Sequence, residues 1–293
     1  MMSASSKLGV AELVERGPHD FILTADVDDT LVPIREHLEP IRAEGLAGLD
    51  KLQRALRMAP HLVGLGVATG NSLGALDAYD QIPEFDAFID IATFKITSVG
   101  TVIHHRRGNE FERDTTWPPQ TEGWNPEKIR ELMKDRPELD DQPPEAQNEH
   151  KVSYWVAGVP DAEHESYIAE LEGLLTPKRI AAQVIFSSGL FLDFLPIGVH
   201  KGSANEHVID TVEAETGRRQ LSIATGNSWN DGEFLEAADF AILPSNADTD
   251  FRDWAISSFS ERLYVAREGF AGGVLEGLQY ASRAGLINFP EAT

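Results

Sequence analysis

The sequence predicts an α/β protein, with a doubly wound parallel sheet at its core and a smaller α+β insertion. Short apolar runs bounded by Gly, Pro, Asn or Asp alternate with longer segments of helical spacing, which is typical of strand–helix units. The hydrophobic content is 42% over 293 residues, enough for a substantial core. Residues 115–144 differ from the rest because they are rich in Pro, Glu and Trp.

The main sheet is expected to contain six short strands. They are Phe21–Val27, Leu62–Ala68, Ala87–Ile91, Leu221–Ala224, Phe240–Leu243 and Arg262–Val265. Between the first two, leucines at 46, 49, 52 and 56 follow a near-helical spacing. Further helices are expected at 232–239 and 272–284. This alternation places helices on both faces of a parallel sheet.

The middle of the chain predicts a separate small domain. Two apolar runs, Lys151–Val156 and Ala182–Phe186, flank a helical segment at 164–175. We place this insertion at 112–187, with residues 1–111 and 188–293 forming the main domain around it. Trp124 and Trp155 are candidates for the insertion's core as much as for a binding surface.

Composition excludes several classes of function. The net charge of −23 disfavours binding to nucleic acid or anionic membranes. No apolar run approaches the roughly 18 residues of a membrane span, and the N-terminus lacks the apolar region of a secretory signal. The absence of cysteine rules out disulfides, thiolate zinc sites and a cysteine nucleophile. We therefore expect a cytoplasmic protein without nucleic-acid or membrane partners.

Asp26 and Asp28 form the first candidate site. They follow the apolar run 21–23, at what would be the carboxyl end of a strand, where ligands bind in doubly wound sheets. Two carboxylates this close repel each other unless a cation lies between them. A hard cation such as Mg²⁺ fits, because it takes oxygen ligands. An ordinary Asp-rich turn is the alternative.

Three later stretches are also candidate ligand-binding segments. Thr69-Gly70 ends an apolar run and opens a helix, an arrangement that suits a phosphate but also simply caps helices. Lys201 opens another helix, although a lone lysine is usually solvated. GNSWND at 226–231 offers Asn227, Asn230 and Asp231 as oxygen ligands, or serves as a capping loop.

These four features, in this order, resemble the motifs of the haloacid dehalogenase (HAD) superfamily of phosphohydrolases: DVDDT, ATGNS, Lys201 and GNSWND. Four other stretches further resemble the sucrose-phosphate phosphatase family: AQVIFSSGLFLDFLPIGVHKGSA, KVSYWV, TSVGTVIHH and the ending GGVLEGLQYA. The resemblance covers nearly the whole chain after residue 20. It implies a HAD-like core with an inserted cap domain and a Mg²⁺-dependent phosphatase activity.

The resemblance also assigns roles. Asp26 would be the nucleophile that forms an aspartyl-phosphate, and Asp28 the general acid and then the general base. Mg²⁺ would be held by Asp26, the Asp28 carbonyl and Asn227, with Asp231 able to compensate by turning inward. Thr69, Gly70 and Lys201 would bind the phosphoryl oxygens, while Thr30 and Asn230 would support the site. The cap would read the sugar, with candidates Lys151, Ser153, Tyr154, Ser187 and Ser188.

The sequence departs from the family pattern at three places. Asn227 stands where the family usually has Asp, and Asn71 where it usually has Arg. Leu190-Phe191 stands near a position that is usually polar or acidic. Three hypotheses therefore remain open: a phosphatase for sucrose 6-phosphate, one for another glycosyl phosphate such as a mannosylfructose or glucosylglycerol phosphate, or a weakly active sugar-phosphate-binding module that partners a synthase.

Overall fold

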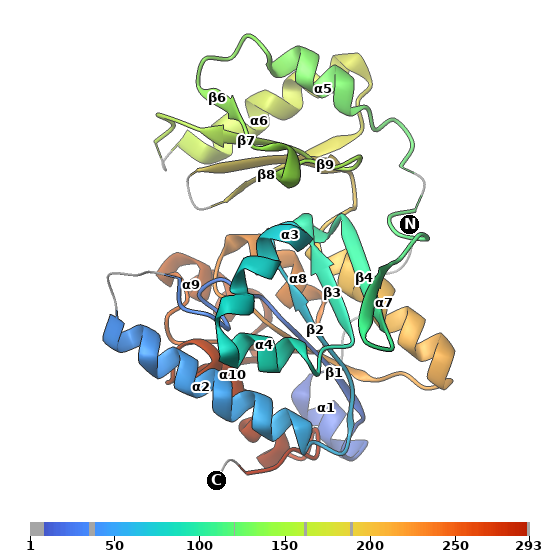
Figure 1. The fold of residues 1–293 in the computed structure, drawn as a ribbon, viewed down its shortest axis with the longest axis vertical. Coiled ribbons are helices and arrows are strands. Elements are labelled where there is room, and N and C mark those ends of the chain that lie inside the picture. The colour runs from blue at the N-terminus through green and yellow to red at the C-terminus, as the bar shows by residue number, and fades with distance from the viewer. Residues whose placement is uncertain (1–8, 35–38, 120, 161–162, 188–189, 292–293) are drawn as a thin grey trace.

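The structure is a computed structural model that describes residues 9–34, 39–119, 121–160, 163–187 and 190–291. Two sheets lie in two separate layers of the molecule (Figure 1). The larger has the strand order β12-β11-β10-β1-β2-β3-β4-β5 and the smaller has the order β6-β7-β9-β8. The larger sheet belongs to the main domain, and the smaller sheet belongs to the inserted domain, which we call the cap.

The main sheet is parallel from β12 to β3, and β4 pairs antiparallel with β3 on one side and with β5 on the other. Its strands are β1 (Phe21–Ala25), β2 (Leu62–Ala68), β3 (Phe94–Thr97), β4 (Val102–Arg107), β5 (Glu110–Arg113), β10 (Leu221–Thr225), β11 (Phe240–Leu243) and β12 (Leu263–Val265). β1 lies between β2 and β10, so the carboxyl ends of these three strands are neighbours. The predicted doubly wound α/β fold is confirmed.

Helices cover both faces of this sheet. Its helices are α1 (Val10–Glu15), α2 (Glu39–Arg57), α3 (Leu73–Leu76), α4 (Pro83–Ile89), α7 (Lys201–Thr216), α8 (Gly232–Ala237), α9 (Thr249–Phe259) and α10 (Phe270–Arg283). Phe21 and Leu23 of β1 pack in a core shared with α2, α4 and α10. Ile22 points to the opposite core, which contains α7, α8 and α9. Strand alternation thus builds two cores on one sheet.

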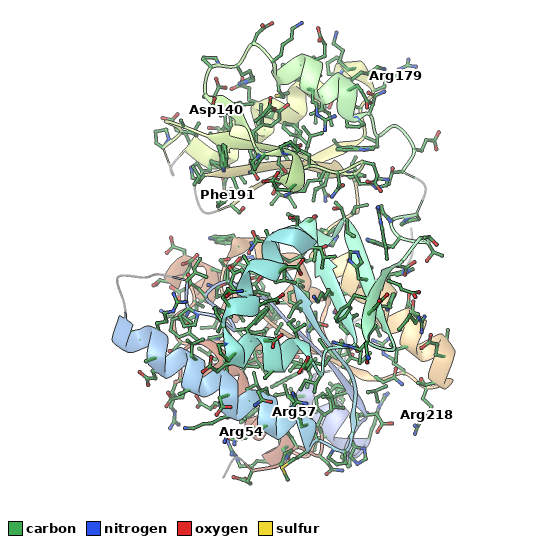
Figure 2. The ribbon with its side chains drawn as sticks, in the orientation of Figure 1. Arg54, Arg57, Asp140, Arg179, Phe191 and Arg218 are labelled. Atoms are coloured by element: carbon green, nitrogen blue, oxygen red, sulfur yellow. The ribbon has the colours of Figure 1, made fainter. Side chains whose placement is uncertain are left out.

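The cap packs its own helices on one face of the smaller sheet. It consists of α5 (Pro126–Met133), β6 (Leu139–Asp141), β7 (Val152–Val156), α6 (His164–Leu175), β8 (Ala182–Ser187) and β9 (Phe191–Pro196). Val152, Tyr154 and Val156 point into a core with these helices. Figure 2 shows Phe191 on the side of the cap that faces the main domain, whereas Arg179 lies on the far side.

Short 3-10 helices complete the fold. They are η2 (Asp77–Gln81), η3 (Ser98–Gly100), η4 (Pro144–Ala146), η6 (Thr176–Lys178), η7 (Trp229–Asp231) and η8 (Ser260–Arg262). Two of them, η3 and η7, lie beside the carboxyl ends of the central strands. Among the residues that the structure describes, no helix is long and apolar enough to cross a bilayer.

Two sequence expectations need correction. Residues 87–91 do not form a strand, because Phe85, Phe88 and Ile89 are buried at helical spacing in α4, which begins at Pro83; the third strand follows at Phe94. The cap also does not end at 187, since β9 pairs with both β7 and β8 in the smaller sheet. The apolar run of β9 resembles a core strand, which is why its sheet could not be read from the sequence.

Candidate active site

The candidate site forms where β1, β2 and β10 end. Asp26 follows β1 and donates its backbone N–H to the carbonyl of Thr225 at 2.9 Å. Thr69 follows β2, and Asn227 lies two residues after β10. All three side chains are nearly or fully buried. The sheet order therefore gathers the motifs that the sequence spreads over 200 residues.

Lys201 lies at the centre of this site. Its ammonium donates to Asp26 Oδ1 and to Asp231 Oδ1, each at 2.8 Å, and its side chain is only 1% exposed. The lysine is the first residue of α7, whose N-cap is His200. Burial alone would lower the pKa of Lys201, but the two carboxylates outweigh burial and raise it. The lysine is therefore a permanent cation against the candidate nucleophile.

Asp26 experiences opposing influences. Burial, together with the nearby carboxylates of Asp231 and Asp28, raises the pKa of Asp26 to about 8. The ammonium of Lys201 opposes them. A second cation beside Asp26 would lower this pKa further and favour the carboxylate, the form that can attack phosphorus.

Asp231 is occupied entirely within the protein. Its Oδ1 accepts from Lys201, while Oδ2 accepts the backbone N–H groups of Asn227 at 3.0 Å and Ser228 at 3.3 Å. It is 0% exposed. Asp231 thus anchors Lys201 and shapes the loop that presents Asn227, and its expected part in metal binding stays a prediction.

Asp28 is held by two donors. Asn71 Nδ2 donates to Asp28 Oδ2 at 2.9 Å, and the hydroxyl of Tyr79 donates to Asp28 Oδ1. Burial raises the pKa of Asp28, and these hydrogen bonds partly oppose the increase. Asn71, one of the departures from the family pattern, is thus a direct partner of the candidate acid.

A strained loop at residues 98–100 supports the Thr69-Gly70 segment. Ser98 donates its N–H to Asn71 O at 2.7 Å, and Val99 donates to Thr69 O at 3.2 Å. Both have positive φ, 53° and 58°, and Gly100 follows with φ 93°. A β-branched residue rarely adopts this conformation, which is common near functional sites. The loop connects the Thr69-Gly70 segment to the start of α7, because Gly100 packs against the backbone of His200 and Lys201.

The oxygen donors fit a magnesium ion. Asp26, the Asp28 carbonyl and Asn227 provide only oxygen atoms, and Mg²⁺ is usually bound through one or two carboxylates with water and phosphate completing its shell. Thr30 donates its hydroxyl to Asn227 Oδ1 at 3.2 Å, which holds the amide oxygen in place. Within the described residues, no cluster of three or more His, Cys, Asp or Glu forms a metal site, so any metal here would depend on the Asn227 amide and the Asp28 carbonyl as well.

A cavity of about 350 Å³ lies over these residues, between the main domain and the cap. Its cap wall contains Gln142, Lys151, Ser187, Phe191 and Asp193. Lys151 Nζ lies 3.2 Å from Asp193 Oδ1, and Ser153 donates to the same oxygen at 2.5 Å. The expected sugar contacts Lys151 and Ser187 therefore line the cavity, and Ser153 lies directly behind them.

The remaining expected residues are distributed as follows. Tyr154 points into the cap core, away from the cavity, because it alternates with Ser153 along β7. Ser188 lies outside the described residues. Asn230 lines this cavity and a second one of about 390 Å³, and it accepts a hydrogen bond from Ser228 at 2.8 Å. Gly70 lines the first cavity.

Two site residues were missed by the sequence analysis. Asp193 carries a signal, since a carboxylate interrupts the apolar strand FLDFLP and must find a buried partner. Tyr79 carries none, because only the folded chain brings η2 beside the loop that follows β1.

Comparison with known proteins identifies the family. The model of the sucrose-6F-phosphate phosphohydrolase family matches residues 19–281. The chain belongs to this family. The probable sucrose-phosphatase 3a of Arabidopsis thaliana is 28% identical over 90% of this chain, and the chain spans only 60% of that relative's length. A putative HAD-like hydrolase of Nitrosococcus oceani is 30% identical over 88% of the chain and 71% of its own.

A solved structure supports the fold. The sucrose-phosphatase from Synechocystis sp. PCC6803, in complex with sucrose and phosphate, matches with a TM-score of 0.72 and 24% identity, covering 93% of this chain and 100% of the other. The core and cap of this family member therefore have the HAD fold, as the motifs predict.

Proposed function

We propose that this family member is a Mg²⁺-dependent phosphatase that hydrolyses a sugar phosphate through an aspartyl-phosphate, with sucrose 6-phosphate as the first candidate. One observation carries the proposal: Asp26 lies at the end of the central strand, 2.8 Å from a buried lysine and beside the Thr69-Gly70 loop. A buried cation next to a carboxylate gives the phosphoryl oxygens a positively charged position against the nucleophile. Family membership supports the same chemistry.

The proposed reaction has two steps. A carboxylate oxygen of Asp26 forms a bond to phosphorus while the bond from phosphorus to the sugar oxygen breaks, and Asp28 gives its proton to that oxygen. Asp28 then takes a proton from water, whose oxygen attacks the aspartyl-phosphate, and phosphate leaves with Asp26 restored. Lys201 and the Thr69-Gly70 segment hold the phosphoryl oxygens in both steps.

Asp26, the Asp28 carbonyl and Asn227 would hold Mg²⁺, which when bound neutralises charge on the phosphoryl oxygens. Asn227 contributes an oxygen but no charge, so we expect this chain to bind the ion more weakly than an aspartate at this position would allow. The geometry around Asn227 is retained, because Thr30 and the Asp231-held loop fix it.

The cap is proposed to select the sugar. Lys151 and Asp193 present a buried ion pair at the cap wall, and Gln142 and Ser187 add neutral polar groups. Phe191 adds an apolar surface of the kind on which a sugar ring can pack, and it is 37% exposed. Because Leu190-Phe191 stands near a position that is usually polar or acidic in the family, another glycosyl phosphate, such as a mannosylfructose or glucosylglycerol phosphate, is the second candidate.

Phosphate release over a panel of sugar phosphates, with Mg²⁺ and with a chelator, tests the proposal. The panel includes sucrose 6-phosphate, the two alternatives and glucose 6-phosphate. We expect Mg²⁺-dependent release that Asp26→Asn abolishes, because an amide is a poor nucleophile. Asp140→Asn, on the exposed edge of the cap, is the matched control and should keep wild-type turnover. A wild-type protein that binds these compounds without releasing phosphate would instead be a binding module, and its partner a synthase.

A further inference from the structure

Tyr79 is an unassigned side chain in direct contact with the candidate acid. It belongs to η2, which follows the Thr69-Gly70 segment and α3 in the chain. Its hydroxyl donates to Asp28 Oδ1, and the residue lines the cavity over Asp26. Tyr79 lies outside the four motifs that resemble those of the superfamily.

The ring of Tyr79 is held from behind. It packs against Phe85 with ring centroids 5.5 Å apart, and Phe85 is fully buried in the main core. The hydroxyl therefore reaches Asp28 from a rigid base rather than from a mobile loop. The hydroxyl is the donor in this hydrogen bond to the Asp28 carboxyl group.

Tyr79 and Asn71 together engage both oxygens of the Asp28 carboxyl group. Two donors on two oxygens fix the plane of a carboxylate. Hydrogen bonds to a charged acceptor are also stronger than those to a neutral one. Such a pair stabilises Asp28 most when it has just lost its proton, which is the state reached as the leaving oxygen is protonated.

We propose that Tyr79 is a positioning residue for proton transfer by Asp28, holding its carboxyl group toward the leaving oxygen. The inference rests on the proposed phosphatase activity. As the P–O bond to the leaving group breaks, the proton moves from Asp28 to that oxygen, and the negative charge that forms on Asp28 is shared with the hydroxyl of Tyr79 and the amide of Asn71. No other reactant is needed.

The test uses leaving groups of different basicity. Hydrolysis of p-nitrophenyl phosphate, whose leaving anion is stable, needs little help from an acid, whereas phenyl phosphate releases a phenol with a pKa of about 10. We compare kcat/KM for both substrates in wild type and Tyr79→Phe, because kcat/KM reports the step in which the leaving group departs. We expect a loss of about tenfold or more for phenyl phosphate and less than about threefold for p-nitrophenyl phosphate, a part of the 10²–10⁴-fold that general acid catalysis supplies.

Two controls accompany the variant. Tyr264→Phe removes the same kind of bond, from a tyrosine hydroxyl to Glu276 at 2.8 Å, at the far edge of the main sheet. It should leave kcat/KM unchanged for both substrates. Asn71→Ala removes the second donor and should show the same dependence on the leaving group. Thermal melting checks that each variant folds.

Several results would overturn the inference. Equal losses for both substrates would mean that Tyr79 supports the structure only. A raised KM with unchanged kcat would make it a substrate contact instead. If wild type hydrolyses no phosphomonoester, the proposed function itself fails, and the role of Tyr79 fails with it; wild-type activity with no selective loss in Tyr79→Phe rejects the role of Tyr79 alone.

Discussion

Removing the buried ammonium of Lys201 should strongly destabilise the protein. Lys201→Met keeps most of the length of the side chain but leaves Asp26 and Asp231 facing each other without a cation, and neither is more than 4% exposed. Breaking a buried ion pair by removing one partner costs about 3–5 kcal/mol. Since a typical domain is stable by about 5–15 kcal/mol, a loss of this size is readily measured.

Adding Asp231→Asn to Lys201→Met should recover part of the loss. In the double variant Asp26 is the one carboxyl group left of the two that contacted Lys201, and burial raises its pKa, so it can remain neutral at pH 7 at small cost. The amide oxygen that Asp231→Asn introduces can still accept a hydrogen bond from the loop backbone. We expect the double variant to be at least about 1 kcal/mol more stable than Lys201→Met.

Urea unfolding at pH 7, with a chelator present, gives the free energies of unfolding of wild type and the three variants by linear extrapolation. The Asp231→Asn single variant, in which Lys201 keeps Asp26, should lose only about 1–3 kcal/mol. The reasoning is refuted if Lys201→Met costs less than about 1 kcal/mol, or if the second substitution lowers stability further.

Three other predictions follow from neighbouring parts of the structure. Asn227→Asp should lower the Mg²⁺ concentration for half-maximal phosphate release at saturating substrate, because it restores a charge to the proposed donor set; coinciding titration curves would remove Asn227 from it. Gly100→Ala should lower stability by about 1–3 kcal/mol and weaken phosphate inhibition, since Gly100 has φ 93° and an added Cβ would lie 2.3 Å from the carbonyl carbon of His200; an unchanged melting temperature would contradict this. Burial would raise the pKa of Asp114, but hydrogen bonds from Thr116, His207 and His105 outweigh it and lower the pKa. The stabilisation from a lowered carboxyl pKa is present above the unfolded pKa near 4 and is lost as pH falls through the folded pKa. Asp114→Asn should therefore cost about 1–2 kcal/mol at pH 7 and progressively less in acid. A difference in unfolding free energy between the variant and wild type that grows below pH 4 would contradict this.

The site residues are easiest to predict from the sequence where they directly follow a strand. Asp26, Thr69 and Asn227 each come directly or closely after an apolar run, and a parallel sheet brings such ends together. Lys201 opens a helix rather than following a strand, so its position against Asp26 rests on the resemblance until the fold is known. The order of the motifs therefore predicts well which residues meet at this edge of the sheet.

Long-range packing accounts for what the sequence does not reveal. Residues 87–91 fit a strand as a short apolar run, and only the burial of Phe85 and Phe88 on one helical face distinguishes the two. β9 has no local feature that assigns it to the cap sheet. Tyr79 contacts Asp28 across 51 residues of sequence, and the sequence does not show that Asp231 holds Lys201 and the loop backbone with its two oxygens.

The short connection between β9 and α7 has an evolutionary consequence. Only residues 197–200 separate the last cap strand from Lys201, yet the lysine is fixed from the other side by two aspartates of the main domain. Changes within the cap can therefore accumulate close to the chemistry in the chain while the ammonium stays in place. If the cap selects the sugar as proposed, substitutions in β8 and β9 can change the preferred sugar while the proposed phosphate chemistry of the main domain is retained.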